Sequence, residues 1–245
     1  MEKSRHKILF HLNGARKLDL RSQYYVRKML PLSIFVLNFI GEPLMYGLIA
    51  TIYRFKSIQD LFGPTVFYEG MRIVSFTIFI SISIHLMKDY LKECLNKIKS
   101  IPNLIIWVGG GYVVITVLLQ IIEPSIFSMF DVDRSVIIQQ NVKESLNEIF
   151  WLSFVSGAFL IPISEEFIFR YGIIGTNNKN IFAKVLLSSL FFGLMHAYDE
   201  HPIYITYYVC MGFILAFIYC KNDNNILYTI SLHMLTNFIG IITQL

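Results

Sequence analysis

Seven long apolar stretches run through this chain, and they constrain its fold more than any other feature. A helix needs about 20 apolar residues to cross the hydrocarbon core of a bilayer. Of the 245 residues, 55% are hydrophobic and 16% are charged, whereas an ordinary soluble domain carries roughly 25% charged residues. We therefore expect an all-α, polytopic membrane protein, a bundle of about seven to eight transmembrane helices. The predicted spans are 29–53, 73–87, 101–122, 149–176, 182–197, 202–220 and 226–243.

Two details of these stretches concern helix length and shape. Span 73–87 is short, so its helix should extend into residues 69–72 or to Lys88. Proline removes a backbone donor and clashes with the preceding turn of a helix. Kinks are therefore expected at three prolines within or beside the spans, namely Pro43, Pro124 and Pro162.

The N-terminal segment sets the expected orientation. Residues 1–28 carry eight Lys or Arg and two acidic residues, and positively charged flanks stay in the cytoplasm. We expect 1–28 to be a basic cytoplasmic segment and 29–245 to be one integral membrane domain. A composition rich in Ile, Lys and Asn favours a bacterial cell membrane. Alternating crossings then place loops 88–100, 177–181 and 221–225 inside and loops 54–72, 123–148 and 198–201 outside.

Several polar side chains interrupt the apolar stretches of the second half. An ionisable group at membrane depth costs roughly 3 kcal/mol or more and is a functional-site hypothesis by default. Five such groups and one amide lie within 149–243, which indicates chemistry rather than packing alone. They are Glu165, Glu166, Arg170, His196, His233 and Asn237.

Helical spacing suggests a task for each of these groups. Glu166 and Arg170 are four residues apart, so they share a helix face and should form a supporting ion pair. Glu165 points about 100° away around the helix and can face a cavity as a general base. His233 and Asn237 are also four apart, and together they could stabilise a developing oxyanion.

Depth in the bilayer gives an independent reason to group these residues. At 1.5 Å rise per residue, Glu165, His196, His233 and Asn237 lie roughly 12 to 22 Å above the predicted cytoplasmic loops. The hydrocarbon core is about 30 Å thick, so all four fall near its middle. Gly193 precedes His196 by three residues and would let another helix approach closely there. We infer that three helices converge on one buried cavity.

Hydrolysis suits such a cavity best. Glu165 and His196 could take a proton from water that attacks a peptide carbonyl. A zinc version is the alternative, in which His196, His233 and Glu165 supply three ligands and water the fourth. The chain lacks the HExxH motif, and we expect no required cofactor.

The motifs, in chain order, are Glu165-Glu166-x-x-x-Arg170, Phe192-x-x-x-His196 and His233-x-x-x-Asn237. They resemble the signature motifs of the CPBP family, named for CAAX proteases and bacteriocin-processing enzymes and also called the Abi or type II CAAX prenyl endopeptidase family. The resemblance runs from Trp151 to Phe238 and places a catalytic core at about 149–240. Each motif alone is weak, but three in order are specific. The family usually has Gly directly after the motif arginine, where this chain has Tyr171, a difference that concerns helix packing.

The resemblance implies an intramembrane endopeptidase in which Glu165 and His196 activate water and His233 and Asn237 stabilise the oxyanion. It implies a glutamate-type mechanism without obligatory zinc, although relatives are often labelled metalloproteases. The implied substrates are small hydrophobic or lipid-modified peptides or protein tails. Examples are CAAX-like proteins, bacteriocin leaders and peptide pheromone precursors used in quorum sensing.

Two other classes of function stay open. Some relatives act by binding, as bacteriocin self-immunity proteins or as modulators of a sensor kinase, but retention of every proposed catalytic residue favours an enzyme. A proton-relaying transporter is the third class, and no paired broken helices support it. The expected partners are the peptide substrate and the lipid bilayer, and nothing indicates nucleic acid. The oligomeric state cannot be predicted from these features.

Overall fold

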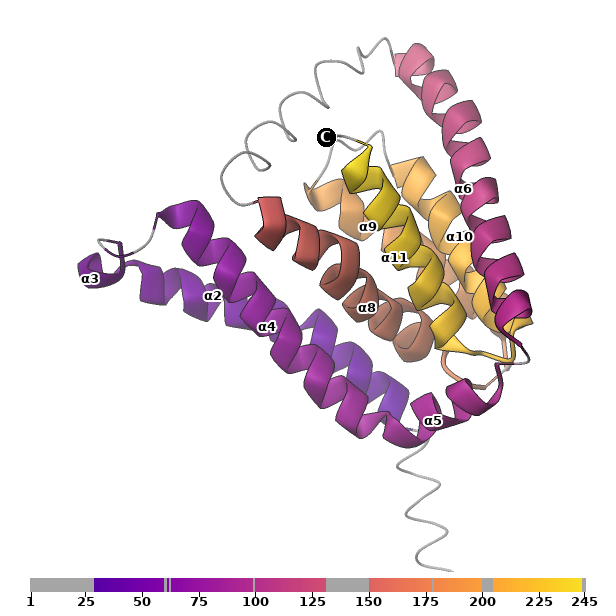
Figure 1. Ribbon diagram of the computed structural model, residues 1–245, viewed down its shortest axis with the longest axis horizontal. Helices are drawn as coiled ribbons and strands as arrows, with labels where there is room; N and C mark the ends of the chain where they lie inside the picture. The colour runs from indigo at the N-terminus through magenta and orange to yellow at the C-terminus, as the bar shows by residue number, and fades with distance from the viewer. Residues whose placement is uncertain are drawn as a thin grey trace, which may run out of the picture.

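The computed structural model describes residues 29–59, 61, 63–98, 100–130, 150–177, 179–199 and 205–243, and these are helical apart from short turns (Figure 1). The expectation of an all-α membrane protein is confirmed for this part of the chain. Its elements, with η for π-helical segments, are α2 (Gly41–Tyr53), α3 (Lys56–Gln59), α4 (Pro64–Leu86), α5 (Lys88–Asn96), α6 (Ile101–Phe130), η1 (Ser156–Leu160), α8 (Ile161–Glu166), η2 (Phe167–Ile174), α9 (Ile181–Asp199), α10 (Ile205–Lys221) and α11 (Ile226–Ile242).

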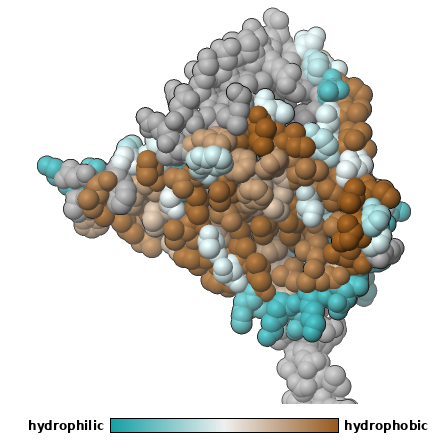
Figure 2. Space-filling model, in the orientation of Figure 1, coloured by the Kyte–Doolittle hydropathy of each residue, from teal (hydrophilic) through white to brown (hydrophobic). Residues whose placement is uncertain are grey.

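All seven predicted apolar stretches contain helices of the observed fold. Within the part of the chain that the structure describes, four helical spans are long and apolar enough to cross a membrane, and three shorter apolar helices follow them. On the face that it presents, Figure 2 shows a broad hydrophobic surface and a hydrophilic band at the end that carries α5. The long spans are Met29–Tyr53, Pro64–Leu86, Ile101–Leu118 and Phe150–Ile174, and the shorter helices are Ile181–His196, Ile205–Lys221 and Ile226–Ile242. The predicted cytoplasmic segment 1–28 lies outside the described residues.

The predicted helix irregularities appear in three different forms. The short second span extends at its N-terminal side, since α4 begins at Pro64 and ends before Lys88, which starts α5. Pro43 follows an interruption at Ile40, after which α2 begins. Pro124 lies inside α6, and Pro162 stands in the first turn of α8, directly after the π-helical segment η1.

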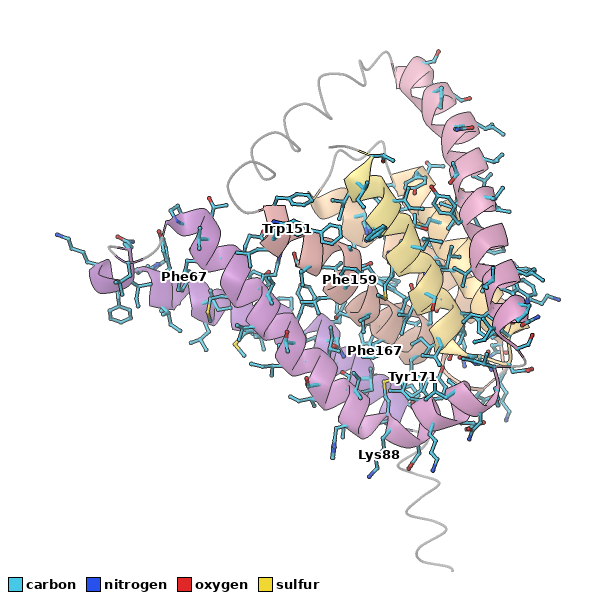
Figure 3. All side chains as sticks on the ribbon, in the orientation of Figure 1. Phe67, Lys88, Trp151, Phe159, Phe167 and Tyr171 are labelled. Atoms are coloured by element: carbon cyan, nitrogen blue, oxygen red, sulfur yellow. The ribbon has the colours of Figure 1, made fainter. Side chains whose placement is uncertain are left out.

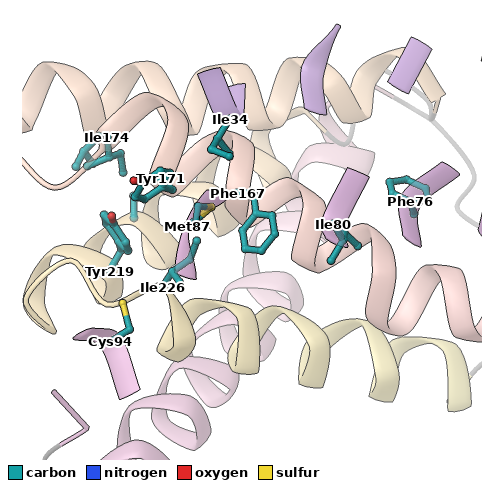
Figure 4. Packing of buried hydrophobic residues seen from close by; sticks show 12 residues of the cluster. Ile34, Phe76, Ile80, Met87, Cys94, Phe167, Tyr171, Ile174, Tyr219 and Ile226 are labelled. Carbon is teal, nitrogen blue, oxygen red and sulfur yellow. The ribbon is translucent and has the colours of Figure 1, made fainter. Parts of the chain in front are cut away.

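One packed cluster joins the first helices to the C-terminal half of the chain (Figure 4). Ile34 and Met87 from the N-terminal helices pack with Phe167 and Tyr171 of the span that continues through η2. Figure 3 labels Trp151 and Tyr171 near the two ends of that span. The ring of Tyr171 lies 4.5 Å from the ring of Tyr90 on α5, so the residue that departs from the family pattern anchors α5 to the bundle.

Hydrogen bonds connect α5 and the turns that follow η2 and α10 at one end of the bundle. The Tyr90 hydroxyl donates to the Asn224 carbonyl at 2.6 Å, and the Asn225 amide donates to the Cys94 carbonyl at 2.8 Å. The Tyr219 hydroxyl donates to the carbonyl of Gly175, at 3.1 Å. Segments near 88–97, 175–177 and 221–225 therefore share one end of the molecule, as alternating crossings require. Which side of the membrane this end faces stays a prediction.

Helices α9 and α10 approach each other closely at two glycines. A Cβ atom on Gly193 would clash with Val209 and would lie 3.0 Å from the carbonyl oxygen of Ile205. Gly212 of α10 faces Phe192, whose Cβ would be 3.2 Å from an added Cβ. Because backbone atoms are among these neighbours, the close approach predicted at Gly193 is confirmed, and it holds His196 against α10.

We expect Gly193→Ala to lower the thermal unfolding midpoint, because the new methyl group forces α9 and α10 apart at a cost of about 1–3 kcal/mol. Gly240→Ala is the matched control, since a Cβ at that position in α11 meets no heavy atom within 4 Å. Both midpoints would be measured in the same detergent. Equal midpoints for the two variants would contradict the assigned packing.

Candidate active site

The two adjacent glutamates sit at the C-terminal end of α8, between two π-helical segments. Glu165 is 7% exposed and Glu166 is fully buried. π-Helical turns interrupt the regular hydrogen-bond ladder and occur frequently at functional sites. The short α-helical piece thus presents both carboxylates to the helices packed around it, and α8 contacts α11 and α4.

Glu166 forms the ion pair that the four-residue spacing predicts. Its Oε2 atom lies 3.1 Å from Nε of Arg170, an electrostatic contact rather than a geometrically good hydrogen bond, and both side chains are completely buried. Nη1 of Arg170 donates to the Ser188 hydroxyl at 2.9 Å, and that hydroxyl donates to the Phe169 carbonyl at 2.8 Å. The guanidinium also lies 5.2 Å from the centre of the Phe192 ring. The pair is therefore held by α9 as well as by its own helix.

Glu165 faces two imidazole rings from two other helices. Its Oε1 lies 3.7 Å from Nε2 of His196 on α9, and its Oε2 lies 3.5 Å from Nε2 of His233 on α11. These separations are longer than direct hydrogen bonds, and catalytic contacts of this kind often shorten when substrate binds. The predicted convergence of Glu165, His196 and His233 is present in the structure.

His233 occupies a position that helical spacing alone did not predict. Its Nδ1 atom lies 3.1 Å from Oε1 of Glu166, while its Nε2 faces Glu165. The imidazole therefore bridges two neighbouring carboxylates. Because a carboxylate is an acceptor, Nδ1 carries the proton in this contact, and Glu166 orients the ring so that Nε2 points into the site.

His196 is oriented by its own helix and by α10. Its Nδ1 lies 2.8 Å from the Phe192 carbonyl oxygen, which only accepts, so Nδ1 carries the proton and Nε2 faces Glu165. The Tyr208 ring stacks on the imidazole with a centroid distance of 3.9 Å and an interplanar angle of 19°. Sequence reasoning missed Tyr208 in this position, because nothing in the chain pattern shows which residue of α10 faces His196.

Asn237 contacts a backbone carbonyl of η1. Its amide nitrogen donates to the oxygen of Gly157 at 3.0 Å. The Ile161 N–H bonds to Ser156 in the π register, and Pro162, which would follow it in that register, has no N–H to give to Gly157. Asn237 therefore supplies a donor that the helix itself cannot. Its part in oxyanion stabilisation stays a prediction.

The zinc alternative requires His196, His233 and Glu165 to act as ligands. Among the residues that the structure describes, no group of three or more His, Cys, Asp or Glu side chains has a metal-binding arrangement. In the observed geometry both Nε2 atoms face oxygens of Glu165, as the distances above show. We derive no catalytic step through a metal ion, and metal dependence is tested below.

Comparisons with known proteins place this site in a family context. The family model described as type II CAAX prenyl endopeptidase Rce1-like matches residues 147–239, a range that contains all six site residues. A protein of Bacillus subtilis (strain 168), named "Putative membrane peptidase YdiL", is 30% identical over 178 residues, which are 71% of this chain and 70% of that protein. No solved structure matches the chain.

Arg170→Met tests whether the buried pair supports the fold. The substitution leaves Glu166 without its guanidinium, and removing one partner of a buried pair costs about 3–5 kcal/mol. We expect a large loss of monodisperse protein in size-exclusion chromatography. The double variant Glu166→Gln/Arg170→Met removes both charges and should recover most of it. A single variant as abundant as wild type would contradict this role for the pair.

Proposed function

The chain belongs to the CPBP family of CAAX-type intramembrane proteases, and from this premise we propose that it is an endopeptidase in which Glu165 and His196 activate water. The observation that carries the proposal is the meeting of Glu165 with His196 and His233, which come from two other helices and place their Nε2 atoms 3.7 Å and 3.5 Å from the Glu165 carboxylate oxygens. Each imidazole has its Nδ1 held by an acceptor, so each directs Nε2 towards the same carboxylate.

In the proposed first step, a water molecule binds between Glu165 and Nε2 of His196. The Glu165 carboxylate accepts a proton from this water. At the same time, the water oxygen attacks the carbonyl carbon of the scissile peptide bond. A tetrahedral intermediate forms with negative charge on the former carbonyl oxygen. The protonated Glu165 then gives its proton to the leaving nitrogen, the C–N bond breaks, and a carboxylic acid and an amine are released.

The oxyanion would be stabilised by groups on α11. Nε2 of His233 faces the site and can donate a hydrogen bond to the oxyanion when this nitrogen carries a proton. The Asn237 amide carries two N–H groups, and its bond to Gly157 uses one of them. Glu166 acts through His233 as a positioning residue, and Arg170 offsets its charge.

The proposed substrate is a small hydrophobic or lipid-modified peptide or protein tail. The exposed large side chains on the spans that carry Glu165 and His233 are apolar, namely Trp151, Val155 and Ile242, which suits a substrate that approaches from the bilayer. A CAAX-like tail, a bacteriocin leader and a peptide pheromone precursor all fit this description. We propose the peptide and the lipid bilayer as the partners, with no nucleic acid involved and no required cofactor.

Glu165→Gln removes the proposed base and keeps its shape. We expect turnover to fall by about 10²-fold or more while the protein stays folded. Glu93→Gln is the matched control, because Glu93 lies on the surface of α5 and pairs with Lys97. Cleavage of prenylated and unmodified short peptides would be followed by mass spectrometry, with and without a strong zinc chelator.

The outcomes of this assay separate the alternatives. Cleavage lost in Glu165→Gln but kept with chelator supports the glutamate-activated mechanism. Loss with chelator, reversed by zinc, moves His196 and His233 into a metal site. A cellular phenotype that survives Glu165→Gln would instead favour a binding role without catalysis.

Tyr208→Leu tests the stacking contact with His196. An aromatic contact of this kind contributes about 0.5–1.5 kcal/mol, so we expect kcat to fall by about twofold to twelvefold with little change in KM. Tyr208→Phe keeps the ring and should retain the wild-type rate. If the two variants lose kcat equally, the hydroxyl rather than the stacked ring carries the effect.

A further inference from the structure

A second site lies between α6 and α10, which run side by side (Figure 1). A cavity of about 420 Å³ opens there, and its walls are almost entirely apolar. Phe213 and Phe217 on one wall are 46% and 45% exposed, so the cavity is a groove that faces the surroundings of the protein. Its principal lining residues are Ile106, Trp107, Gly110, Val114, Phe213 and Phe217.

The floor of the groove separates it from the proposed catalytic site. A Cβ on Gly111 would lie 2.6 Å from Leu232 and 2.8 Å from Ile218, so α6 packs directly on α11 and α10 at this point. Leu232 and Ile218 belong to the buried cluster that also contains Phe192, whose ring lies beside His233. A ligand lying in the groove would therefore be separated from Glu165 by packed core residues.

Gly110 keeps the groove open. A Cβ at Gly110 would meet no heavy atom within 4 Å, so packing within the protein gives no reason for glycine there. Glycine also weakens a helix interior relative to alanine. Gly109 is equally uncrowded but does not line the groove, which makes it a natural control position.

The positively charged side chain of Lys221 lies at the α5 end of this groove. Nζ of Lys221, an exposed residue at the end of α10, lies 5.5 Å from the centre of the Phe217 ring. The hydrophilic band of Figure 2 marks the same end of the molecule. From Ile106 to Val114 the groove extends about 12 Å along α6, at 1.5 Å per residue. An apolar channel with a positive charge at its interfacial end matches an amphiphile with a negatively charged head.

We propose that this groove binds one acyl chain of an anionic phospholipid from the leaflet at the α5 end, with the lipid phosphate at Lys221. The apolar walls hold the chain, and Lys221 selects the charge of the head group. The proposal does not depend on the catalytic mechanism, because the groove and the site share no lining residue. The packed floor also argues against the lipid tail of a substrate as the occupant.

Trp107 provides a direct reporter, since the chain has two tryptophans and the other, Trp151, is exposed elsewhere. The full chain carrying Trp151→Phe would be reconstituted into phosphatidylcholine vesicles. Phosphatidylglycerol or phosphatidylcholine with brominated acyl chains would then be added at increasing mole fraction, and Trp107 fluorescence quenching recorded. We expect brominated phosphatidylglycerol to bind about fivefold more tightly than brominated phosphatidylcholine.

Three variants locate the binding. Lys221→Gln should abolish the preference for phosphatidylglycerol and leave quenching at the phosphatidylcholine level. Gly110→Leu fills the groove and should reduce quenching by both lipids, whereas Gly109→Leu should not. Equal quenching by the two lipids in the parent protein would show an ordinary lipid annulus and overturn the proposal. Absence of quenching by either lipid would mean that protein, such as a second copy of the chain, covers the groove, and would overturn it too.

Discussion

The buried contact between Glu166 and Arg170 is the constraint on which the catalytic half depends. Two adjacent carboxylates inside an apolar bundle are tolerable only when neighbouring groups offset their charge. The groups that contact Glu166 or its guanidinium partner come from different helices: Arg170 from η2, Ser188 from α9, which accepts a hydrogen bond from that guanidinium, and His233 from α11. Satisfying these charges therefore fixes three helices against one another, and the same contacts orient the imidazole that faces Glu165.

Helix periodicity and bilayer thickness were sufficient to predict the apolar helices and the grouping of Glu165, His196 and His233. Glu166 and Arg170 meet because residues four apart lie on the same face of a helix. This spacing brings them together even though Arg170 belongs to the π-helical segment η2. The depth argument grouped Glu165, His196 and His233, and these three side chains do meet, although His196 lies in the last turn of α9. Both arguments use only local geometry and a common membrane plane, which is why a single sequence carries them.

Contacts between helices were beyond that reasoning. Nothing in the spacing shows that His233 lies between both carboxylates, since the rotation of α11 about its own axis is set by packing at Gly111 and Leu232. The stacking of Tyr208 on His196 likewise depends on the register between α9 and α10 at Gly193. Tertiary packing sets such rotations and registers, and the periodicity of the sequence does not reveal them.

Asn237 shows how one residue can serve the fold and the proposed chemistry together. Pro162 and the π register leave the carbonyl of Gly157 without a donor from its own helix, and the Asn237 amide provides one. This bond ties α11 to the segment that leads into Glu165, so it helps set the position of the carboxylate. Because the amide nitrogen has two N–H groups, the structural bond and a bond to a substrate oxygen are compatible. A neutral amide is well suited to both tasks, since it donates two hydrogen bonds without adding a charge that the bundle would have to offset.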